Sequence, residues 1–490
     1  MTNNTGTGIP EFAVLGHPNE GKSSVVSTLT EDDQIRVSPV PGETTRSSAY
    51  TVKIDGKAIV RFVDTPGFQV PQQTLAWFRN FKGDPAAIVS QFIREHESDP
   101  FFLDECELFR PVSEGAGIIY VVDGSRPVRD DDLAEIEILR LTGRPRMAVI
   151  NSKTDQKDYS ADWKHEFSKS FNAIRIFNSN TAGFSERIAM LESLKPIDQE
   201  WEKSLARVID AFVADWHRRC QAAAARICTF IEKSLGFYLS EPMPEGADEK
   251  SIHARLSKAY ESEIKKMEQQ TFQNIRSMFH HHLYDHRLPA WSVLSHDLFS
   301  EQTWELLGLS TRQLAGVGAL AGGGLGAVLD TAAAGISFGV FTAIGSALGA
   351  GSAVWGGKKI TGRKRAGFRL GGNRFTVGPN RNVQFLFILL DRALIYTCHM
   401  VTRPHGRRDP DSIEQGSNEA GKQGVTTGFS SREKKICAGF FKAVRKDLLS
   451  RDKAARKDFE ALVETAITRI TGQDGNGKIN RKGQTDDLTR

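Results

Sequence analysis

Short apolar runs alternate with amphipathic stretches from Glu11 to about Thr181. This alternation is typical of a parallel β-sheet whose strands are connected by helices. The runs that we expect to form strands are residues 12–15, 59–63, 118–122, 147–150 and 174–177. Asp55-Gly56 separates two further extended segments and predicts a tight antiparallel hairpin. The pattern therefore predicts an α/β domain over residues 11–195, with a mostly parallel sheet and helices on both faces.

One segment of this domain departs from the alternation. Residues 69–115 are too many for a single loop, and Leu75, Phe78, Ile88 and Phe92 recur at roughly helical spacing. We expect a helical insert here.

Long amphipathic helices replace the α/β pattern after Pro196. Apolar residues recur every three to four positions from Trp201 to Ile231 and again from Leu256 to Met278. Ile436 to Ile470 has the pattern of one more amphipathic helix. We expect a mainly α-helical C-terminal domain over residues 196–470, with polar, disordered segments at residues 1–10 and 471–490.

A Gly/Ala-rich stretch at residues 314–357 contains one charge, Asp330, and Lys and Arg residues follow it. One interpretation is a membrane hairpin that turns at Asp330, with its small residues at the helix contact and the basic cluster at the headgroups. The first arm, Leu314–Leu329, is short, because a full span needs about 20 residues. The other interpretation is a hairpin packed inside the C-terminal domain, and both stay open.

Composition narrows the class of protein. The chain has 490 residues and a net charge of +4, which argues against a general nucleic-acid binder. Its five cysteines are scattered without a metal-type pair and suit buried thiols in a reducing compartment. The first residues lack the pattern of a secretory signal. We expect a cytoplasmic protein, with the inner face of the cell membrane as a further location.

The clearest chemical motif is GHPNEGKS at residues 16–23, which fits the P-loop pattern GxxxxGK[ST]. It lies between a predicted strand and a predicted helix, as the motif requires. Backbone N–H groups and the helix N-terminus bind phosphates there, Lys22 reaches the β- and γ-phosphates, and the Ser23 hydroxyl ligates Mg²⁺. The phosphate-binding residues that we expect are Gly16, Asn19, Glu20, Gly21, Lys22, Ser23 and Ser24.

Two further motifs are expected to contact the γ-phosphate or the Mg²⁺ ion beside it. Asp64-Thr65-Pro66-Gly67 ends a strand, so the Asp64 carboxylate can hold the Mg²⁺ shell and the Gly67 N–H can sense the γ-phosphate. Residues 41–46, PGETTR, form a polar loop of switch type. A threonine there completes the Mg²⁺ site only while the γ-phosphate is present.

A base-recognition motif, SKTD, follows the strand that ends at Ile150. Asp155 accepts two hydrogen bonds that guanine offers and adenine does not, which can discriminate by roughly 10⁴. The Lys153 stem lies over the purine, and Ser152 completes the motif. A weaker fifth motif places Ser179 and Asn180 beside the base.

These motifs, in this order, resemble the Era, TrmE and Der group of P-loop GTPases over about the first 180 residues. The P-loop sequence of the group is GRPNxGKS, and that of this chain is GHPNEGKS. The resemblance implies hydrolysis of GTP to GDP and phosphate with Mg²⁺ on Ser23, Thr45 and Asp64, and maps the switch threonine to Thr45 rather than Thr44. It also implies a K⁺ ion at Asn19, although Asn19 can equally well only shape the loop. The catalytic set is then Lys22, Thr45, Asn19 and Gly67.

Phe68 follows Gly67, so the water-positioning glutamine of Ras-like proteins is absent, as in the group generally, and hydrolysis is expected to be slow without K⁺ or an activator. The chain departs from the group at three points, and the first is Ser47, where the group often has Asp. Ser152 stands where asparagine is usual, and Asn151 lies just before it. The fifth motif is only weakly preserved.

The whole layout resembles a bacterial family of Era-type GTPases fused to a large uncharacterised C-terminal domain with a Gly-rich stretch. The leading hypothesis is a GTPase switch in which the helical C-terminal domain is the effector. Contact of this domain with a membrane surface is an open option within this hypothesis. The alternatives are a ribosome- or RNA-assembly GTPase and a GTP-binding interaction protein with negligible turnover. Partners beyond GTP and GDP are an unidentified protein effector and, as open options, a membrane surface and a second G domain; nucleic acid is not expected.

Overall fold

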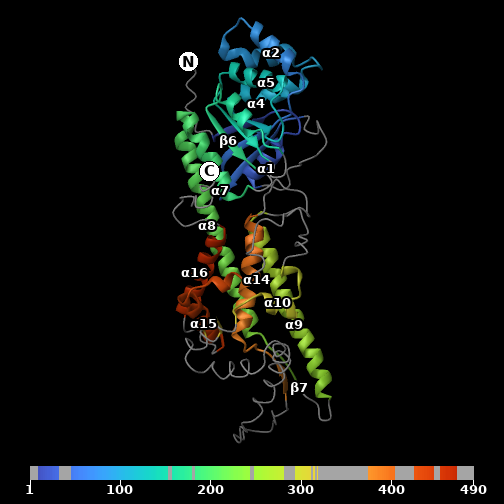
Figure 1. Cartoon of the computed structure of the whole chain (residues 1–490), viewed down its shortest axis with the longest axis vertical. Coiled ribbons are helices and arrows are strands. Elements are labelled where there is room, and N and C mark those ends of the chain that lie inside the picture. The colour runs from blue at the N-terminus through green and yellow to red at the C-terminus, as the bar shows by residue number, and fades with distance from the viewer. Residues whose placement is uncertain are drawn as a thin grey trace, which may run out of the picture. The chain divides into compact units, whose positions relative to one another are not determined.

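The computed structural model contains two compact units. The first consists mainly of the described residues up to Arg218, and the second mainly of those from Arg219. The colours of Figure 1 follow the chain, and its grey trace marks the remaining residues. The described residues are 9–31, 46–152, 157–178, 182–242, 248–280, 293–310, 313, 314, 317, 374–402, 424–445 and 453–471.

A six-stranded sheet in the order β2-β3-β1-β4-β5-β6 forms the centre of the first unit. β2 pairs antiparallel with β3, and every other pair is parallel. The β2–β3 turn is Asp55-Gly56, and both residues have positive φ (51° and 75°), which suits a two-residue hairpin. The strands are β1 (Glu11–Leu15), β2 (Ser48–Ile54), β3 (Lys57–Asp64), β4 (Gly117–Asp123), β5 (Arg146–Asn151) and β6 (Ala173–Phe177).

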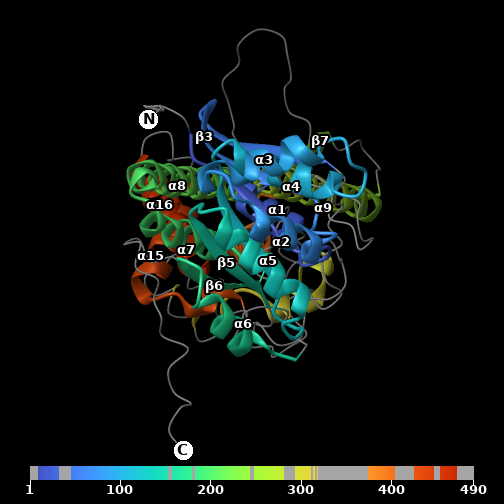
Figure 2. The ribbon, with the colours of Figure 1, turned by 90° about the horizontal axis from the view of Figure 1, so that it is seen from above.

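Helices cover both faces of this sheet (Figures 1 and 2). Alternate strand residues, such as Tyr120 and Ile119, point to opposite faces, so both are buried in separate apolar cores. One face packs against α2 to α6, and the other against α1, α7 and the first half of α8. The helical elements are α1 (Lys22–Thr30), α2 (Pro71–Asn80), η1 (Pro85–Ala87), α3 (Ile88–His96), α4 (Leu103–Ser113), α5 (Asp130–Leu141), α6 (Ser160–Phe167), α7 (Phe184–Leu194), η2 (Lys195–Ile197) and α8 (Gln199–Gly236).

This architecture confirms the predicted fold class, a mostly parallel α/β sheet with helices on both faces followed by a mainly helical region. Helices α2, α3 and α4 occupy the segment in which the sequence predicts a helical insert. The exact domain boundaries remain predictions, since α8 belongs in part to each unit.

The second unit is mainly helical. Its described residues include a small sheet, in which β7 and β8 pair antiparallel. Its elements, after the second half of α8, are β7 (Leu239–Pro242), α9 (Glu249–Met278), η3 (Val293–Ser295), α10 (Glu301–Leu306), β8 (Arg374–Val377), α14 (Val383–Thr402), η5 (Val425–Gly428), α15 (Ser431–Arg445) and α16 (Lys453–Ile470).

Among the described helices, α14 is long and apolar enough to cross a membrane, yet 83% of its apolar window is buried inside the protein. Two charged side chains lie in its middle and are buried. Arg392 forms a bidentate ion pair with Glu268 (2.6 and 3.0 Å). Asp391 accepts hydrogen bonds from the Gly308 N–H (2.8 Å), the Thr426 N–H (2.7 Å) and the Thr426 hydroxyl (2.9 Å). α14 is therefore the core helix of this unit.

The single helix predicted from Ile436 to Ile470 is wrong. Two helices, α15 and α16, occupy this stretch, and the rings of Phe440 and Phe459 stack with centroids 4.1 Å apart. In one straight helix, residues separated by 19 positions would lie about 28 Å apart. The chain reverses because both apolar faces are buried against each other.

Two other expectations concern particular residues. The Gly/Ala-rich stretch 314–357 lies outside the described residues except at Leu314 and Val317, so its two interpretations stay open. None of the five cysteines, all of which lie in the described residues, forms a disulfide; four are buried and Cys398 is half-buried, as expected for thiols in a core.

We predict that Asp391→Ala destabilises the second unit. The substitution leaves buried N–H groups of Gly308 and Thr426 without an acceptor, which costs about 2–4 kcal/mol. Thermal and urea unfolding of the full chain measure the effect. Asp458→Ala, an exposed aspartate of α16, is the matched control and should be neutral. Equal midpoints for the two variants would contradict the anchoring role of Asp391.

Candidate nucleotide-binding site

The P-loop connects β1 to α1 at the carboxyl edge of the sheet. The Lys22 ammonium donates to the carbonyl oxygens of Gly16 (3.1 Å) and His17 (2.8 Å). Lys22 is only 7% exposed, and this burial lowers its pKa. The loop therefore curls around its own lysine, which is the arrangement that aims backbone N–H groups at a phosphate.

The end of β5 holds the P-loop from one side. The Asn151 amide donates to the Glu20 carbonyl oxygen (3.1 Å) and is 2% exposed. Gly21 has φ 93°, and a Cβ there would lie 2.3 Å from the Asn151 amide nitrogen, so only glycine fits. Asn151 thus ties the base-recognition segment to the P-loop, although Ser152 fills the usual asparagine position. Ser152 itself donates its backbone N–H to the Phe177 carbonyl (2.9 Å).

Ser23 and Asp64, the two predicted Mg²⁺ ligands within the described residues, are in contact. The Ser23 hydroxyl donates to Asp64 Oδ2 (2.6 Å). Asp64 is 3% exposed, and its Oδ1 is buried without a hydrogen-bond partner in the described part of the chain. Burial raises the pKa of Asp64, while the hydrogen bond from Ser23 opposes this shift. A hydroxyl beside a carboxylate with a spare oxygen fits the oxygen donors that Mg²⁺ prefers.

The loop after Asp64 packs onto the P-loop. The Phe68 N–H donates to the Gly16 carbonyl (3.3 Å), and a Cβ on Gly67 would lie 2.5 Å from the Pro18 nitrogen. Beyond Gly67 the loop is anchored to the helical insert.

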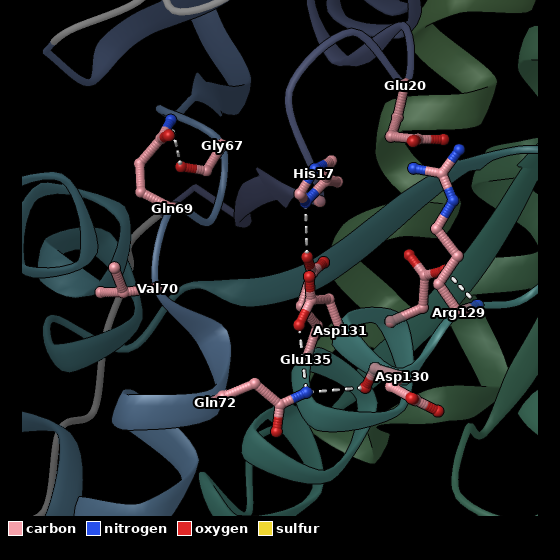
Figure 3. Close-up of polar contacts among 12 residues, drawn as sticks. His17, Glu20, Gly67, Gln69, Val70, Gln72, Arg129, Asp130, Asp131 and Glu135 are labelled. Atoms are coloured by element: carbon pink, nitrogen blue, oxygen red, sulfur yellow. Dashed lines mark hydrogen bonds and ion pairs between the residues drawn. The ribbon is translucent and has the colours of Figure 1, made fainter.

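Glu105 of α4 provides that anchor. Its Oε1 accepts the backbone N–H groups of Gln69 and Val70, both at 2.7 Å, and the side chain is fully buried. Figure 3 shows Gly67, Gln69 and Val70 following one another along this loop. The insert therefore has a structural role at the site.

Two chains of buried ionic contacts support the P-loop from the side of α5, and the sequence did not reveal them. In the first, Arg126 contacts Glu20 Oε1 (2.6 Å) and binds both oxygens of Asp132 (2.7 Å each). In the second, Glu135 contacts His17 Nδ1 (3.0 Å) and accepts a hydrogen bond from the Tyr120 hydroxyl (2.8 Å); Figure 3 shows the His17–Glu135 contact. We name these the arginine brace and the histidine brace.

One signal could have indicated the braces. Asp132 and Glu135 lie three residues apart on α5, on the same face as the buried Ile138 and Leu139. Acidic residues on the apolar face of a helix need partners, but their spacing does not say which ones. Those partners lie up to 118 residues away in the chain.

Several predicted site residues lie outside the described residues: Thr45, Lys153, Asp155, Ser179 and Asn180. The structure does bring together the P-loop residues, Asp64, Gly67 and Ser152 at the carboxyl edge of the sheet. The roles assigned to all of these residues remain predictions.

We predict that Asn151→Ala weakens nucleotide binding about tenfold, because the Glu20 carbonyl loses a buried hydrogen bond and a void opens beside Gly21. Titration with a fluorescent GDP analogue measures the affinity. Asn172→Ala is the matched control, since Asn172 contacts Arg146 at the opposite end of β5. A similar loss in both variants would argue against the tether.

Two family matches divide the chain. Residues 11–152 match the family described as "50S ribosome-binding GTPase", and residues 164–466 match the "Domain of unknown function (DUF3482)". The second match alone covers more than half of the chain.

Curated relatives match the N-terminal part. The probable GTP-binding protein EngB of Dechloromonas aromatica is 32% identical over 208 residues, which are 41% of this chain and 80% of EngB. The GTPase Era of Clostridioides difficile is 25% identical over 241 residues, 48% of this chain and 68% of Era. The GTPase Der of Bifidobacterium longum is 26% identical over 203 residues, and the chain covers 39% of it.

Among solved structures, Era in complex with MgGDPNP and a segment of 16S ribosomal RNA aligns with a TM-score of 0.25 and 17% identity. The alignment covers 35% of this chain and 51% of that one. The family matches and the EngB relative, taken with the P-loop described above, identify the chain as a P-loop GTPase whose GTP-binding domain is joined to a member of the DUF3482 family.

Proposed function

We propose that the protein hydrolyses GTP to GDP and phosphate and acts as a molecular switch that its helical C-terminal domain reads. The observation that carries this proposal is the position of α8. Its first half belongs to the core of the GTPase domain, and the same helix continues into the second unit. A conformational change in the GTPase domain that moves the first half of α8 would therefore also move the second half of this helix, because the two halves are continuous.

The chemistry follows from the P-loop residues. Lys22 binds the β- and γ-phosphates, and Ser23, Asp64 and Thr45 hold Mg²⁺, which neutralises charge on the phosphate oxygens when bound. The Ser23–Asp64 contact supports the Mg²⁺ part of this assignment. Asp155 selects guanine.

Hydrolysis needs help, because Phe68 is fully buried and has no group that could orient water. We propose that K⁺ at Asn19 or an activating partner supplies it. Asn19 has φ 66°, a left-handed conformation that asparagine adopts more readily than most residues, and this conformation fits a loop-shaping role equally well.

We predict slow phosphate release from GTP that rises in K⁺ relative to Na⁺ and falls at least 100-fold in Lys22→Ala, which removes charge stabilisation in the transition state. Asp155→Asn should reduce the preference for GTP over ATP without abolishing the fold. GTP binding without turnover in either salt would instead favour the interaction-protein alternative.

A buried contact links the switch region to α8. Glu31 directly precedes residues 32–45, which include most of the predicted switch loop, and its carboxylate pairs with Arg187 of α7 (2.8 Å). Both side chains are at most 9% exposed. The Arg187 guanidinium lies 4.1 Å from the ring centroid of Phe212 in α8. A displacement of Glu31 would therefore act on α8 through one side chain.

Further contacts fix the first half of α8 to the GTPase domain. The Trp201 ring meets Phe12 of β1 edge-on at 4.9 Å, and Trp216 stacks on Phe184 of α7 at 4.4 Å. Because packed side chains transmit small shifts rather than absorbing them, α8 is well placed to follow α7 and the sheet.

We predict that Arg187→Gln uncouples α8 from the bound nucleotide. Hydrogen exchange of residues 199–218 should differ between GDP and a non-hydrolysable GTP analogue in the native protein, and this difference should shrink severalfold in Arg187→Gln and in Glu31→Gln. Arg218→Gln is the matched control, since Arg218 lies on α8 itself but pairs with the exposed Asp55. Nucleotide affinity, measured in parallel, distinguishes a loss of coupling from a loss of binding. If the difference in hydrogen exchange between the two nucleotide states were the same in Arg187→Gln as in the native protein, coupling through Arg187 would be rejected.

Ribosome assembly is the second candidate. The family description "50S ribosome-binding GTPase" favours it. The net charge of +4 counts against extensive contacts with RNA. Ribosomal RNA that copurifies with the GTP-bound protein, but not with Lys22→Ala, would favour assembly.

Membrane contact is a further proposal, and its support is the Gly/Ala-rich composition of residues 314–357. The buried helix α14 does not supply it, because its polar groups have partners within the second unit. Flotation with anionic liposomes, with and without the Gly/Ala-rich stretch, tests it.

A further inference from the structure

Both segments that are predicted to respond to the γ-phosphate contact the same helix, α4 of the insert. One segment is the loop after Asp64, in which Gly67 is the predicted sensor. The other lies just before β2, where Ser47 follows the predicted Mg²⁺ ligand Thr45 by two residues. GTP has a γ-phosphate and GDP does not, so a helix that holds both segments is placed to distinguish the two nucleotides.

The first of these segments is fixed to α4 by a carboxylate and by a ring contact. The fully buried Glu105 accepts the backbone N–H groups of Gln69 and Val70 at 2.7 Å each. These groups directly precede α2, and a carboxylate beside the N-terminus of a helix is favoured by the helix dipole. The Phe68 ring meets the Phe109 ring of α4 edge-on, with centroids 5.9 Å apart. This segment therefore cannot move away from α4 without breaking buried contacts.

The second segment is fixed to α4 at a carbonyl group whose usual helical donor is missing. In a regular helix the Glu107 carbonyl would accept the N–H of the residue four positions later, but this residue is Pro111, which has no N–H. The Ser47 hydroxyl donates to the Glu107 carbonyl at 2.8 Å. The proline inside α4 thus leaves open the acceptor that Ser47 uses.

The helix α4 is a firm base for these contacts. Leu108, Phe109 and Val112 are fully buried in the core that covers one face of the sheet. The groups that contact the two segments all lie between Glu105 and Phe109, which is little more than one turn of a helix. A shift of either segment therefore acts on the other through this turn of α4.

We propose that α4 couples the two segments to the γ-phosphate, and that Ser47 and Glu105 are positioning residues for GTP but not for GDP. With GTP bound, Thr45 and Gly67 contact the γ-phosphate or its Mg²⁺, and the contacts with α4 hold both segments in place. GDP offers neither segment a γ-phosphate, so the contacts with α4 add nothing to its affinity. The inference rests on the proposed binding of guanine nucleotides and assigns the insert a role in distinguishing them.

The size of the effect follows from linkage. If bound GTP strengthens the contacts with α4, these contacts strengthen the binding of GTP by the same factor. One net hydrogen bond, such as that of the Ser47 hydroxyl, changes an equilibrium about three- to tenfold. Loss of this bond should therefore weaken the binding of GTP alone, whereas a general loss of structure would weaken GDP and GTP alike.

The test compares the affinities of the full chain for GDP and for a non-hydrolysable GTP analogue. In Ser47→Ala we expect the affinity for the analogue to fall about three- to tenfold and the affinity for GDP to stay within about twofold. Glu105→Gln should act in the same direction, because an amide accepts hydrogen bonds less strongly than a carboxylate of the same shape. Ser113→Ala is the matched control and should keep both native affinities, since the Ser113 hydroxyl donates to the Arg110 carbonyl within α4 (2.7 Å).

A double variant separates coupling from stability. Ser47→Ala removes a donor from the Glu107 carbonyl, and Pro111→Ala provides an N–H for this carbonyl within the helix. The Ser47→Ala/Pro111→Ala variant should therefore regain thermal stability relative to Ser47→Ala without regaining affinity for the analogue. Recovery of both properties would show that Ser47 serves only the fold of α4, and it would overturn the inference.

Hydrogen exchange of α4 provides a further measurement. In the native protein the backbone amides of residues 103–113 should exchange more slowly with the analogue bound than with GDP bound, and Ser47→Ala should remove most of this difference. The inference would be overturned, with nucleotide binding left intact, by equal exchange in the two states. Affinities for GDP and the analogue that change equally, or not at all, in Ser47→Ala and Glu105→Gln would have the same consequence. If the native protein bound neither nucleotide, the proposed function would be overturned along with the inference.

Discussion

Parallel pairing of β1 with β3 and β4 is the constraint on which the nucleotide site depends. The carboxyl ends of parallel strands meet at one edge of a sheet, so the loops that leave them converge. The register places Val14 opposite Asp64 and Ile119, which brings the P-loop within reach of the Asp64 loop. β5 continues this edge and ends at Asn151, next to the Glu20 carbonyl. A slip of two residues in any of these pairings would separate groups that must act together.

Buried ion pairs fix the positions of segments that the backbone fold brings close together. Each unit contains ion pairs that are almost fully removed from water: Glu20 with Arg126 and Glu31 with Arg187 in the first, and Glu268 with Arg392 in the second. Such pairs add little net stability, because desolvation offsets much of their attraction, but breaking one leaves an uncompensated charge and is costly. They therefore act as constraints on geometry. In the first unit they fix the P-loop and Glu31, which directly follows α1.

The sequence predicted the elements of the GTPase domain because its strands are apolar runs and its motifs sit at their ends. The P-loop and the Asp64 motif depend on local spacing, and the structure places them at one edge. The partners of the buried acidic residues on α5 could not be predicted, because Glu135 and His17, for example, are 118 positions apart and only the folded sheet brings them together. The reversal between α15 and α16 was missed for a related reason. Helical periodicity is the same in one long helix and in two that pack against each other.

The position of α8 decides how a GTPase domain of this kind could affect the rest of its chain. Its 38 residues contain no proline, and the one glycine, Gly236, ends the helix, so neither a proline nor a glycine kink lies within it. At 1.5 Å per residue the helix is about 57 Å long, and its hydrogen bonds resist bending. A flexible linker would absorb a shift of Phe212 within a few residues, whereas a continuous helix passes it on along its axis. The proposed switch therefore depends on the residues that anchor the first half of α8 to the GTPase domain.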